Sequence, residues 1–257
     1  MKHNFIHLIV IYTLFSIISV YYLSQDLSAS TNNISDLLIY STCSFDFSAN
    51  FNIMKIFYTV FPILLIFSYI HSYISDDLSS NCAYIFCRTL KRKSWLIKLY
   101  IHVFTKLLLI NFILGILKLI IFMIYGYQIY DYMNFFIILV QILILETIMQ
   151  LTLILLCNVI TLINCSQIGY FISISCYLIN IISFYLSYLT NHKWLNFLPF
   201  TQNFVVTYNN GVIDRTNYYF SHYNVNYSFS SAIIQSCMYL FILGLLGLPI
   251  IQKKEFI

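Results

Sequence analysis

Six stretches of about 20 to 30 mostly apolar residues run along this chain of 257 residues. A run of that length, coiled as an α-helix, crosses the roughly 30 Å hydrocarbon core of a bilayer. Only 9% of the residues are charged and 60% are hydrophobic, whereas a soluble domain carries about 25% charged residues. A soluble fold of this size could not keep so much apolar surface away from water. We therefore predict an all-α integral membrane protein.

The predicted helices belong to a single transmembrane domain over residues 1–257. Their ranges are 5–24, 56–74, 99–125, 134–162, 168–189 and 232–251. The first is longer than the apolar region of a usual signal peptide and lacks a convincing cleavage site after it, so we expect it to be retained. The link between the fourth and fifth, "NCSQIG" at 164–169, is short enough to make them an antiparallel hairpin.

Lysine and arginine are distributed unevenly among the connections. In multi-pass proteins these residues gather on the cytoplasmic side. Eight lie on the side that we assign to the cytoplasm: Lys2, Arg88, Lys91, Arg92, Lys93, Lys98, Lys253 and Lys254. Three lie on the other side: Lys55, Lys193 and Arg215. This bias predicts six crossings with both termini in the cytoplasm. The abundance of isoleucine, asparagine, tyrosine, phenylalanine and lysine looks like that of an AT-rich bacterial genome, so we expect the protein in a bacterial cytoplasmic membrane.

The long outer connection at 190–231 contains a weakly apolar segment, "WLNFLPFTQNFVV" at 194–206. It is too short to cross a bilayer. One interpretation is a re-entrant or interfacial segment between the fifth and sixth helices, and the other is an ordinary exposed loop. In the first, four aromatic residues lie at headgroup level. They are Trp194, Phe197, Phe200 and Phe204.

The cytoplasmic connection at 75–98 contains the basic and aromatic stretch "CAYIFCRTLKRKSW" at 82–95. Asp76 and Asp77 precede it, and acidic residues favour a helix start, so we predict a short amphipathic helix from about residue 80 to 90. Its basic residues either contact anionic lipid or flank an aromatic surface that docks into another protein. The candidate docking residues are Tyr84, Ile85, Phe86, Arg88, Lys91, Arg92 and Lys93.

Three ionisable residues fall inside the predicted helices, where a charge is costly and often functional. Lys106 lies about 12 Å along the helix from Lys98, and we expect its side chain to reach the cytoplasm. Lys118 lies about 10 Å from the outer end of the same helix, and we expect it to reach outward. Glu146 lies near the middle of the fourth helix, too deep to reach water.

Gln150 and Asn158 continue a polar stripe from Glu146 along the fourth helix, and we expect this stripe to face the protein interior. Glu146 then has two interpretations. It is protonated or paired with Lys118 or Lys106 and holds helices together, or it belongs to a translocation path or conformational switch.

Several kinds of site lack their sequence signals. The seven cysteines contain no Cys-x-x-Cys, and His71 and His102 belong to no His-Glu-x-x-His motif, so we expect neither a catalytic site nor a metal site. The chain has no phosphate-binding Gly-x-x-x-x-Gly-Lys-Ser/Thr loop. It also has no basic soluble domain of the kind that binds nucleic acid. We expect no cofactor on this chain.

Six helices, cytoplasmic termini and a short amphipathic helix after the second resemble the type-2 ABC exporter permeases. The stretch "SDDLSSNCAYIFCRTLKRKSWLIKLY" at 75–100 is similar to that of small bacterial members, often encoded beside peptide-toxin or bacteriocin export and immunity systems. The resemblance implies that this stretch is a coupling helix seated in a separate ATPase subunit, which binds ATP and Mg. It also implies a homodimer or heterodimer of permeases, and a broken or re-entrant region at "NFLPFTQNF". Members commonly begin with an additional amphipathic helix, which we expect to be missing or merged here.

The leading hypothesis is therefore a permease that exports hydrophobic or amphipathic peptides, such as a toxin, a bacteriocin or an antimicrobial peptide. Such peptides already partition into the bilayer surface, from which a permease can take them laterally. Two alternatives stay open. One is a non-transporting immunity or scaffold protein, and the other is a secondary transporter that uses Glu146 to carry protons.

Overall fold

The computed structural model describes residues 2–27, 33–42, 53–71, 73, 92–190, 199–200 and 229–253, and nearly all of them lie in α-helices. The helices are α1 (Lys2–Leu27), α2 (Ile34–Thr42), α3 (Ile53–Ile70), α5 (Arg92–Ile124), α6 (Tyr132–Ile163), α7 (Ser166–Thr190) and α9 (Phe229–Lys253). Within these residues the β-type pairing is one isolated bridge, between Asn33 and Gln128. The predicted all-α fold is confirmed.

Five helices are long and apolar enough to cross a membrane. Their candidate spans are Phe5–Tyr22, Ser94–Ile124, Tyr132–Ile163, Ser166–Ser183 and Phe229–Ile250. Helix α3 is also apolar, but the stretch of it whose side chains the structure describes, Phe57–Ile70, is shorter than these five spans. The chain is thus a multi-pass membrane protein by the length and composition of these helices.

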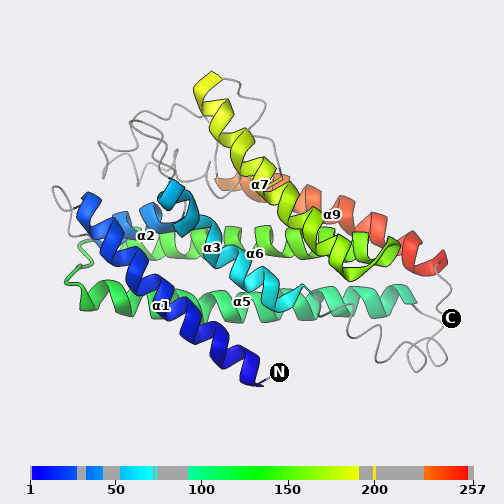
Figure 1. The fold of residues 1–257 in the computed structure, drawn as a ribbon, viewed down its shortest axis with the longest axis horizontal. Helices are drawn as coiled ribbons and strands as arrows, with labels where there is room; N and C mark the ends of the chain where they lie inside the picture. The colour runs from blue at the N-terminus through cyan, green and yellow to red at the C-terminus, as the bar shows by residue number, and fades with distance from the viewer. Residues whose placement is uncertain are drawn as a thin grey trace.

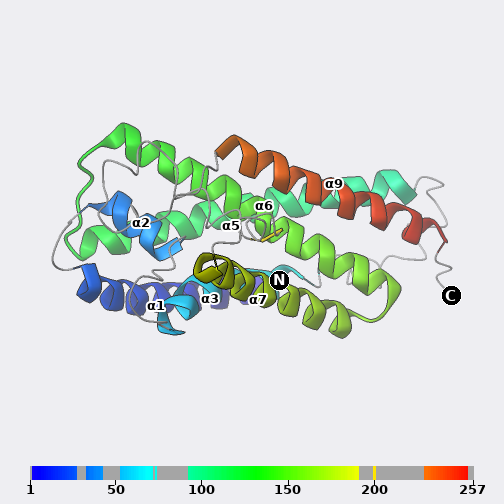
Figure 2. The ribbon, with the colours of Figure 1, turned by 90° about the horizontal axis from the view of Figure 1, so that it is seen from above.

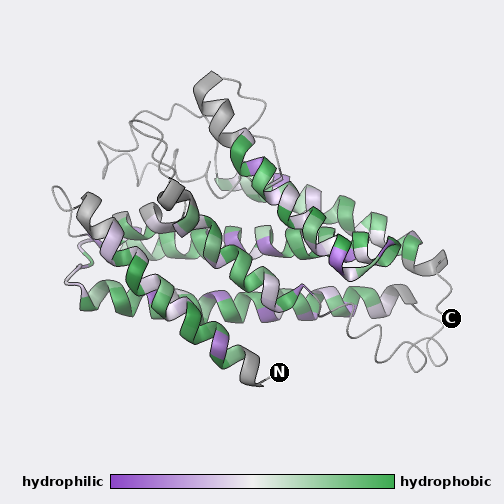
Figure 3. Cartoon of the chain, viewed as in Figure 1, coloured by the Kyte–Doolittle hydropathy of each residue, from purple (hydrophilic) through white to green (hydrophobic). Residues whose placement is uncertain are grey.

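The long helices alternate in direction along the chain and form an elongated bundle (Figure 1). Helix α6 is central, because it contacts α2, α3, α5, α7 and α9. Seen from above, α6 passes between α9 on one side and α1, α3 and α7 on the other (Figure 2). Hydrophobic residues follow every long helix (Figure 3), and Phe171, Ile179 and Phe241 are at least 60% exposed. Such surfaces suit contact with lipid.

Helix α6 begins where Asp131 caps it and keeps polar residues buried along its length. The Asp131 carboxylate accepts hydrogen bonds from the backbone N–H groups of Met133 and Asn134, at 3.1 and 3.2 Å. Gln150 and Asn158 are only 1% and 2% exposed. The prediction that this polar stripe faces the interior is therefore confirmed for these two residues.

The predicted hairpin between the fourth and fifth helices is also confirmed. Helix α6 ends at Ile163 and α7 begins at Ser166, so Asn164 and Cys165 form the whole link. The two helices then pack along each other. Gly169, in the first turns of α7, lies close to the backbone of Cys157 in α6. The absence of a side chain at Gly169 permits this close approach.

Helix α2 lies in the connection at 25–55, between the first and second predicted helices. Its residues Ile34, Leu37 and Leu38 are buried, and their spacing places them on one face of the helix. The Ile34 N–H donates a 3.0 Å hydrogen bond to the Gln128 carbonyl. This bond places the start of α2 at the turn between α5 and α6, at that end of the bundle.

Much of the predicted docking stretch lies outside the described residues, namely Tyr84, Ile85, Phe86, Arg88 and Lys91. Helix α5 begins at Arg92, seven residues before the predicted boundary, so Arg92 and Lys93 occupy its first turn.

The segment 194–206 also lies outside the described residues, apart from Pro199 and Phe200. Phe200 is 2% exposed, and its ring meets that of Tyr177 edge-on with the centroids 5.9 Å apart. Since Tyr177 lies within Ser166–Ser183, the candidate span of α7, Phe200 packs against that span.

Candidate functional site

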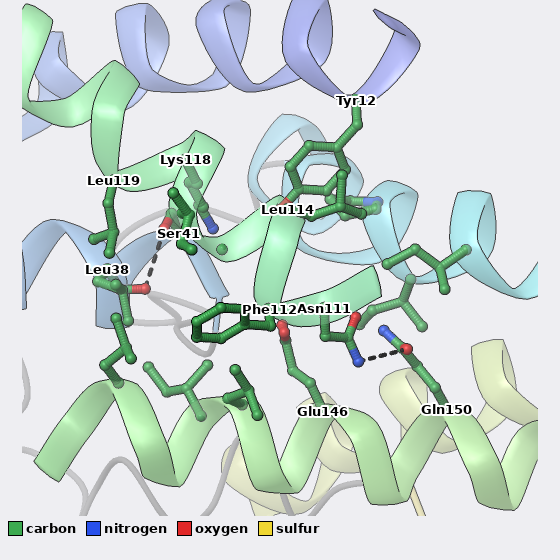
Figure 4. Close-up of a pocket in the computed structure, with 18 of the residues that line it drawn as sticks. Tyr12, Leu38, Ser41, Asn111, Phe112, Leu114, Lys118, Leu119, Glu146 and Gln150 are labelled. Atoms are coloured by element: carbon green, nitrogen blue, oxygen red, sulfur yellow. Dashed lines mark hydrogen bonds between the residues drawn. The ribbon is translucent and has the colours of Figure 1, made fainter. Parts of the chain in front are cut away.

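A cavity of about 100 Å³ lies in the bundle between α1, α2, α3, α5 and α6 (Figure 4). Most of its wall is made of leucine, isoleucine, phenylalanine and proline side chains. Seven lining residues carry polar side chains: Tyr12, Ser41, Thr59, Asn111, Lys118, Glu146 and Gln150. This is the place in the described chain where an acid, a base and two carboxamides meet inside the membrane-spanning helices.

Glu146 lies midway along α6, and its side chain is partly exposed because it faces the cavity. A polar group at this depth is expensive unless other polar groups or water satisfy it. The cavity supplies such groups from α5 and from the next turn of α6.

Lys118 faces the same cavity and interacts electrostatically with Glu146. It is only 8% exposed, and its Nζ lies 5.9 Å from the centre of the Phe122 ring. The Lys118 ammonium therefore lies inside the bundle on the side of Phe122, where α2 packs against the helices and Ile121 and Phe122 are themselves buried. The outward reach of Lys118 stays a prediction.

Lys106 is placed differently from Lys118. Its Nζ lies 3.8 Å from the centre of the Tyr73 ring, its side chain is partly exposed, and it does not line the cavity. Of the two lysines that the sequence offered as a neighbour for Glu146, the structure thus brings Lys118 to it.

A chain of hydrogen bonds joins α5 to α6 beside Glu146. The Thr147 hydroxyl donates to the Leu143 carbonyl at 2.7 Å. The Asn111 Nδ2 group donates to Thr147 Oγ1 at 3.0 Å and to Gln150 Oε1 at 2.9 Å. Asn111, Thr147 and Gln150 are at most 6% exposed. Polar side chains that bond one another in this way hold two membrane helices in register.

Sequence reasoning did not single out Asn111, Thr147 or Tyr12. The available signal was strongest for Asn111, which is the sole carboxamide in the long apolar run of α5. A lone carboxamide in such a run requires a partner on another helix.

The two histidines considered at the sequence level pack against aromatic rings. The His71 ring lies 4.5 Å from that of Tyr170, and the His102 ring lies 5.8 Å from that of Tyr73. Among the described residues, no three His, Cys, Asp or Glu side chains are grouped as metal ligands.

Chemically, the cavity can bind a small polar group and can exchange a proton at Glu146. It offers a carboxyl, an ammonium and two carboxamides, framed by apolar walls. Comparison of the chain with protein-family models, with curated proteins and with solved structures finds no match.

Proposed function

We propose that this chain is the membrane-spanning permease subunit of an ATP-binding-cassette exporter that moves hydrophobic or amphipathic peptides. One observation carries the proposal. In a bundle of alternating helices, α3 and α5 are joined by a connection at 71–91, which holds the aromatic residues Tyr84 and Phe86 and the basic residues Arg88 and Lys91. An aromatic surface flanked by basic residues suits docking into a second protein, here a separate ATPase subunit that binds ATP and Mg.

The proposal counts α3 as a membrane crossing in addition to the five candidate spans. The chain then crosses six times, and both termini lie in the cytoplasm. The 18 residues of α3 would extend about 27 Å, close to the thickness of the hydrocarbon core. Aromatic contacts attach α3 to α1, since the Phe15 ring lies 4.5 Å from that of Phe61 and 5.7 Å from that of Phe57. These contacts support a place for α3 within the bundle.

The apolar outer faces of α7 and α9 support a peptide cargo and a dimeric permease. Side chains such as Ile182, Met238 and Phe241 are more than half exposed, so these helices present wide apolar surfaces within the bilayer. A peptide already partitioned into the membrane can reach such a surface laterally. A second permease, identical or homologous, would frame the path from the opposite side.

A substitution in the predicted docking stretch gives the direct test of this proposal. Phe86→Asp is expected to reduce the amount of ATPase subunit that co-purifies from native membranes by at least about tenfold, because it places a charge in an aromatic contact. Phe86→Tyr, which keeps the ring, serves as the matched control. Quantitative mass spectrometry and ATP hydrolysis by the purified particle measure the effect. Capture of no ATPase by the unaltered chain, or equal capture by both variants, would contradict the coupling role.

Glu146 favours a second candidate function, a proton-coupled transporter, because its carboxyl shares a cavity with Lys118 deep in the bundle. We expect Glu146→Gln to lower transport more than Lys118→Gln, since glutamine can neither bind nor release a proton. Transport into vesicles separates the candidates. Uptake that needs ATP favours the exporter, and uptake that stops when the proton gradient collapses favours the second. Equal activity of both variants would refute the ranking.

A third outcome concerns the immunity or scaffold alternative. A chain that transports nothing with either energy source, yet captures a partner whose ATP hydrolysis does not change, would support that alternative and overturn both transport proposals.

A further inference from the structure

The hydrogen-bond chain beside Glu146 leaves two specific atoms for a ligand. The Thr147 hydroxyl hydrogen is used on the Leu143 carbonyl, so Thr147 Oγ1 acts as an acceptor toward Asn111. The group of Asn111 that faces it must then be the NH₂, whose other hydrogen bonds Gln150 Oε1. The orientation of both carboxamides is thereby fixed.

This orientation frees one acceptor and one donor. Within the described residues, neither Asn111 Oδ1 nor Gln150 Nε2 has a hydrogen-bond partner. Both residues line the cavity, and both are more than nine-tenths buried. Figure 4 shows the Asn111 oxygen and the Gln150 nitrogen on the same side of the pair, turned away from the α6 ribbon. Leaving such groups unpaired at this depth is unfavourable, which points to a polar occupant.

The charges around these atoms favour a neutral occupant. Glu146 and Lys118 line the same cavity and have opposite charges when both are ionised, so an added ion would then leave the cavity with a net charge in low-dielectric surroundings. A carboxylate would offer acceptors alone, and an ammonium donors alone, whereas the site presents one of each. The matching ligand group is neutral and carries a donor beside an acceptor.

We propose that the cavity binds a primary carboxamide, whose NH₂ donates to Asn111 Oδ1 and whose oxygen accepts from Gln150 Nε2. A primary carboxamide holds an N–H and its oxygen on the same edge, so it bonds both atoms at once. A trans peptide group directs its N–H and C=O to opposite sides and presents one of them at a time. Walls formed by Ile63, Ile66 and Leu114 suit the apolar carbons beside the amide.

The size of the cavity sets the size of the bound group. An engineered apolar cavity of about 150 Å³ holds one benzene molecule, so about 100 Å³ accommodates a smaller group. The carboxamide end of an asparagine or glutamine side chain, or of an amidated carboxyl terminus, is small enough for this volume. In the exporter proposed above, on which this assignment of the source rests, the carboxamide belongs to the peptide cargo.

Binding of two small probes to the purified chain in lipid nanodiscs tests the site without ATPase or transport. Propionamide and butan-2-one have nearly the same shape, but the ketone has a methyl group in place of the NH₂. Ligand-observed NMR titration is expected to show propionamide binding at least about tenfold more tightly. Equal affinities would overturn the proposal and leave water as the partner of both atoms.

Two variants separate the roles of the two residues. Asn111→Leu removes the acceptor for the NH₂ and is expected to abolish the preference for propionamide. Gln150→Met removes the donor to the oxygen that both probes carry, so it should weaken both and keep the preference. A cooperative thermal unfolding transition, even at a lower temperature than that of the parent, verifies that each variant is folded, and a preference unchanged in Asn111→Leu would overturn the assignment.

Capped hydrophobic peptides then identify the source of the carboxamide. One peptide carries a glutamine side chain and a second carries an amidated carboxyl terminus, and each is compared with its methyl-ketone analogue. A preference for one amide names the source, and no preference in either overturns the link to cargo. Loss of ATPase capture with intact propionamide binding would instead refute the exporter and leave the site standing.

Discussion

Replacement of Gly169 by alanine is expected to destabilise the protein by about 3 kcal/mol. A Cβ at this position would lie 2.7 Å from the Cys157 carbonyl oxygen and would also overlap Thr161 Oγ1. A side chain can rotate away from such an overlap, but a backbone carbonyl cannot. The link of Asn164 and Cys165 is too short to let α6 and α7 separate freely, so the strain stays at this contact.

Gly244→Ala is the matched control for this prediction, because an added Cβ there meets no atom within 4 Å. Alanine favours a helix over glycine, so this variant is expected to be as stable as the parent or slightly more stable. Unfolding by titration with sodium dodecyl sulfate measures both. A second change, Thr161→Ala, should recover part of the loss in Gly169→Ala, since it removes one of the overlapping atoms. Similar stability of the Gly169 and Gly244 variants would show that the close approach is not required.

Hydrophobic run length was sufficient to predict the long helices and the α6–α7 hairpin, but it placed the start of α5 too late. Residues 92–98 contain Arg92, Lys93 and Lys98, so hydropathy assigned them to the connection. The stretch contains neither glycine nor proline, and nothing in it stops the helix from extending into the polar surroundings. Hydropathy indicates which part of a helix lies in lipid. The ends of the helix depend instead on residues that stop a helix, such as glycine and proline.

Helix α2 could not be predicted from the sequence, for a different reason. Its buried residues Ile34, Leu37 and Leu38 have helical spacing, but nine residues between polar segments give too weak a pattern to predict a helix. Packing against the end of the bundle stabilises it, and that packing depends on the positions of α5 and α6. The burial of Lys118 depends on the same packing and could not be predicted for the same reason.

Which of the two lysines, Lys106 or Lys118, lies near Glu146 depends on how α5 is rotated about its axis. Twelve residues separate the two lysines, which places them about 120° apart around a helix. Both therefore cannot face Glu146, and the sequence alone does not tell which one does. The bond from Asn111 to Thr147 and Gln150 fixes this rotation, and it joins residues far apart in the chain.

Replacement of Lys118 by methionine is expected to destabilise the protein by about 2 kcal/mol, because it removes a buried cation that interacts electrostatically with Glu146 across the cavity. The variant leaves Glu146 inside the bundle without the cation that interacts with it. Glu146 then either stays ionised at a high cost or binds a proton and loses its charge. Titration with sodium dodecyl sulfate at neutral pH measures the loss.

The double variant Lys118→Met with Glu146→Gln distinguishes a lost interaction from simple loss of packing. If the cost arises from an uncompensated carboxylate, removing that charge recovers most of the stability, and the two changes are strongly non-additive. Lys106→Met makes the same substitution on the same helix and serves as the matched control. Lys106 contacts the Tyr73 ring at 3.8 Å, so its loss should cost at most about 1 kcal/mol. Equal losses for the two lysines, or additive effects in the double variant, would mean that Glu146 does not depend on Lys118, and the cavity would then hold two independent charges.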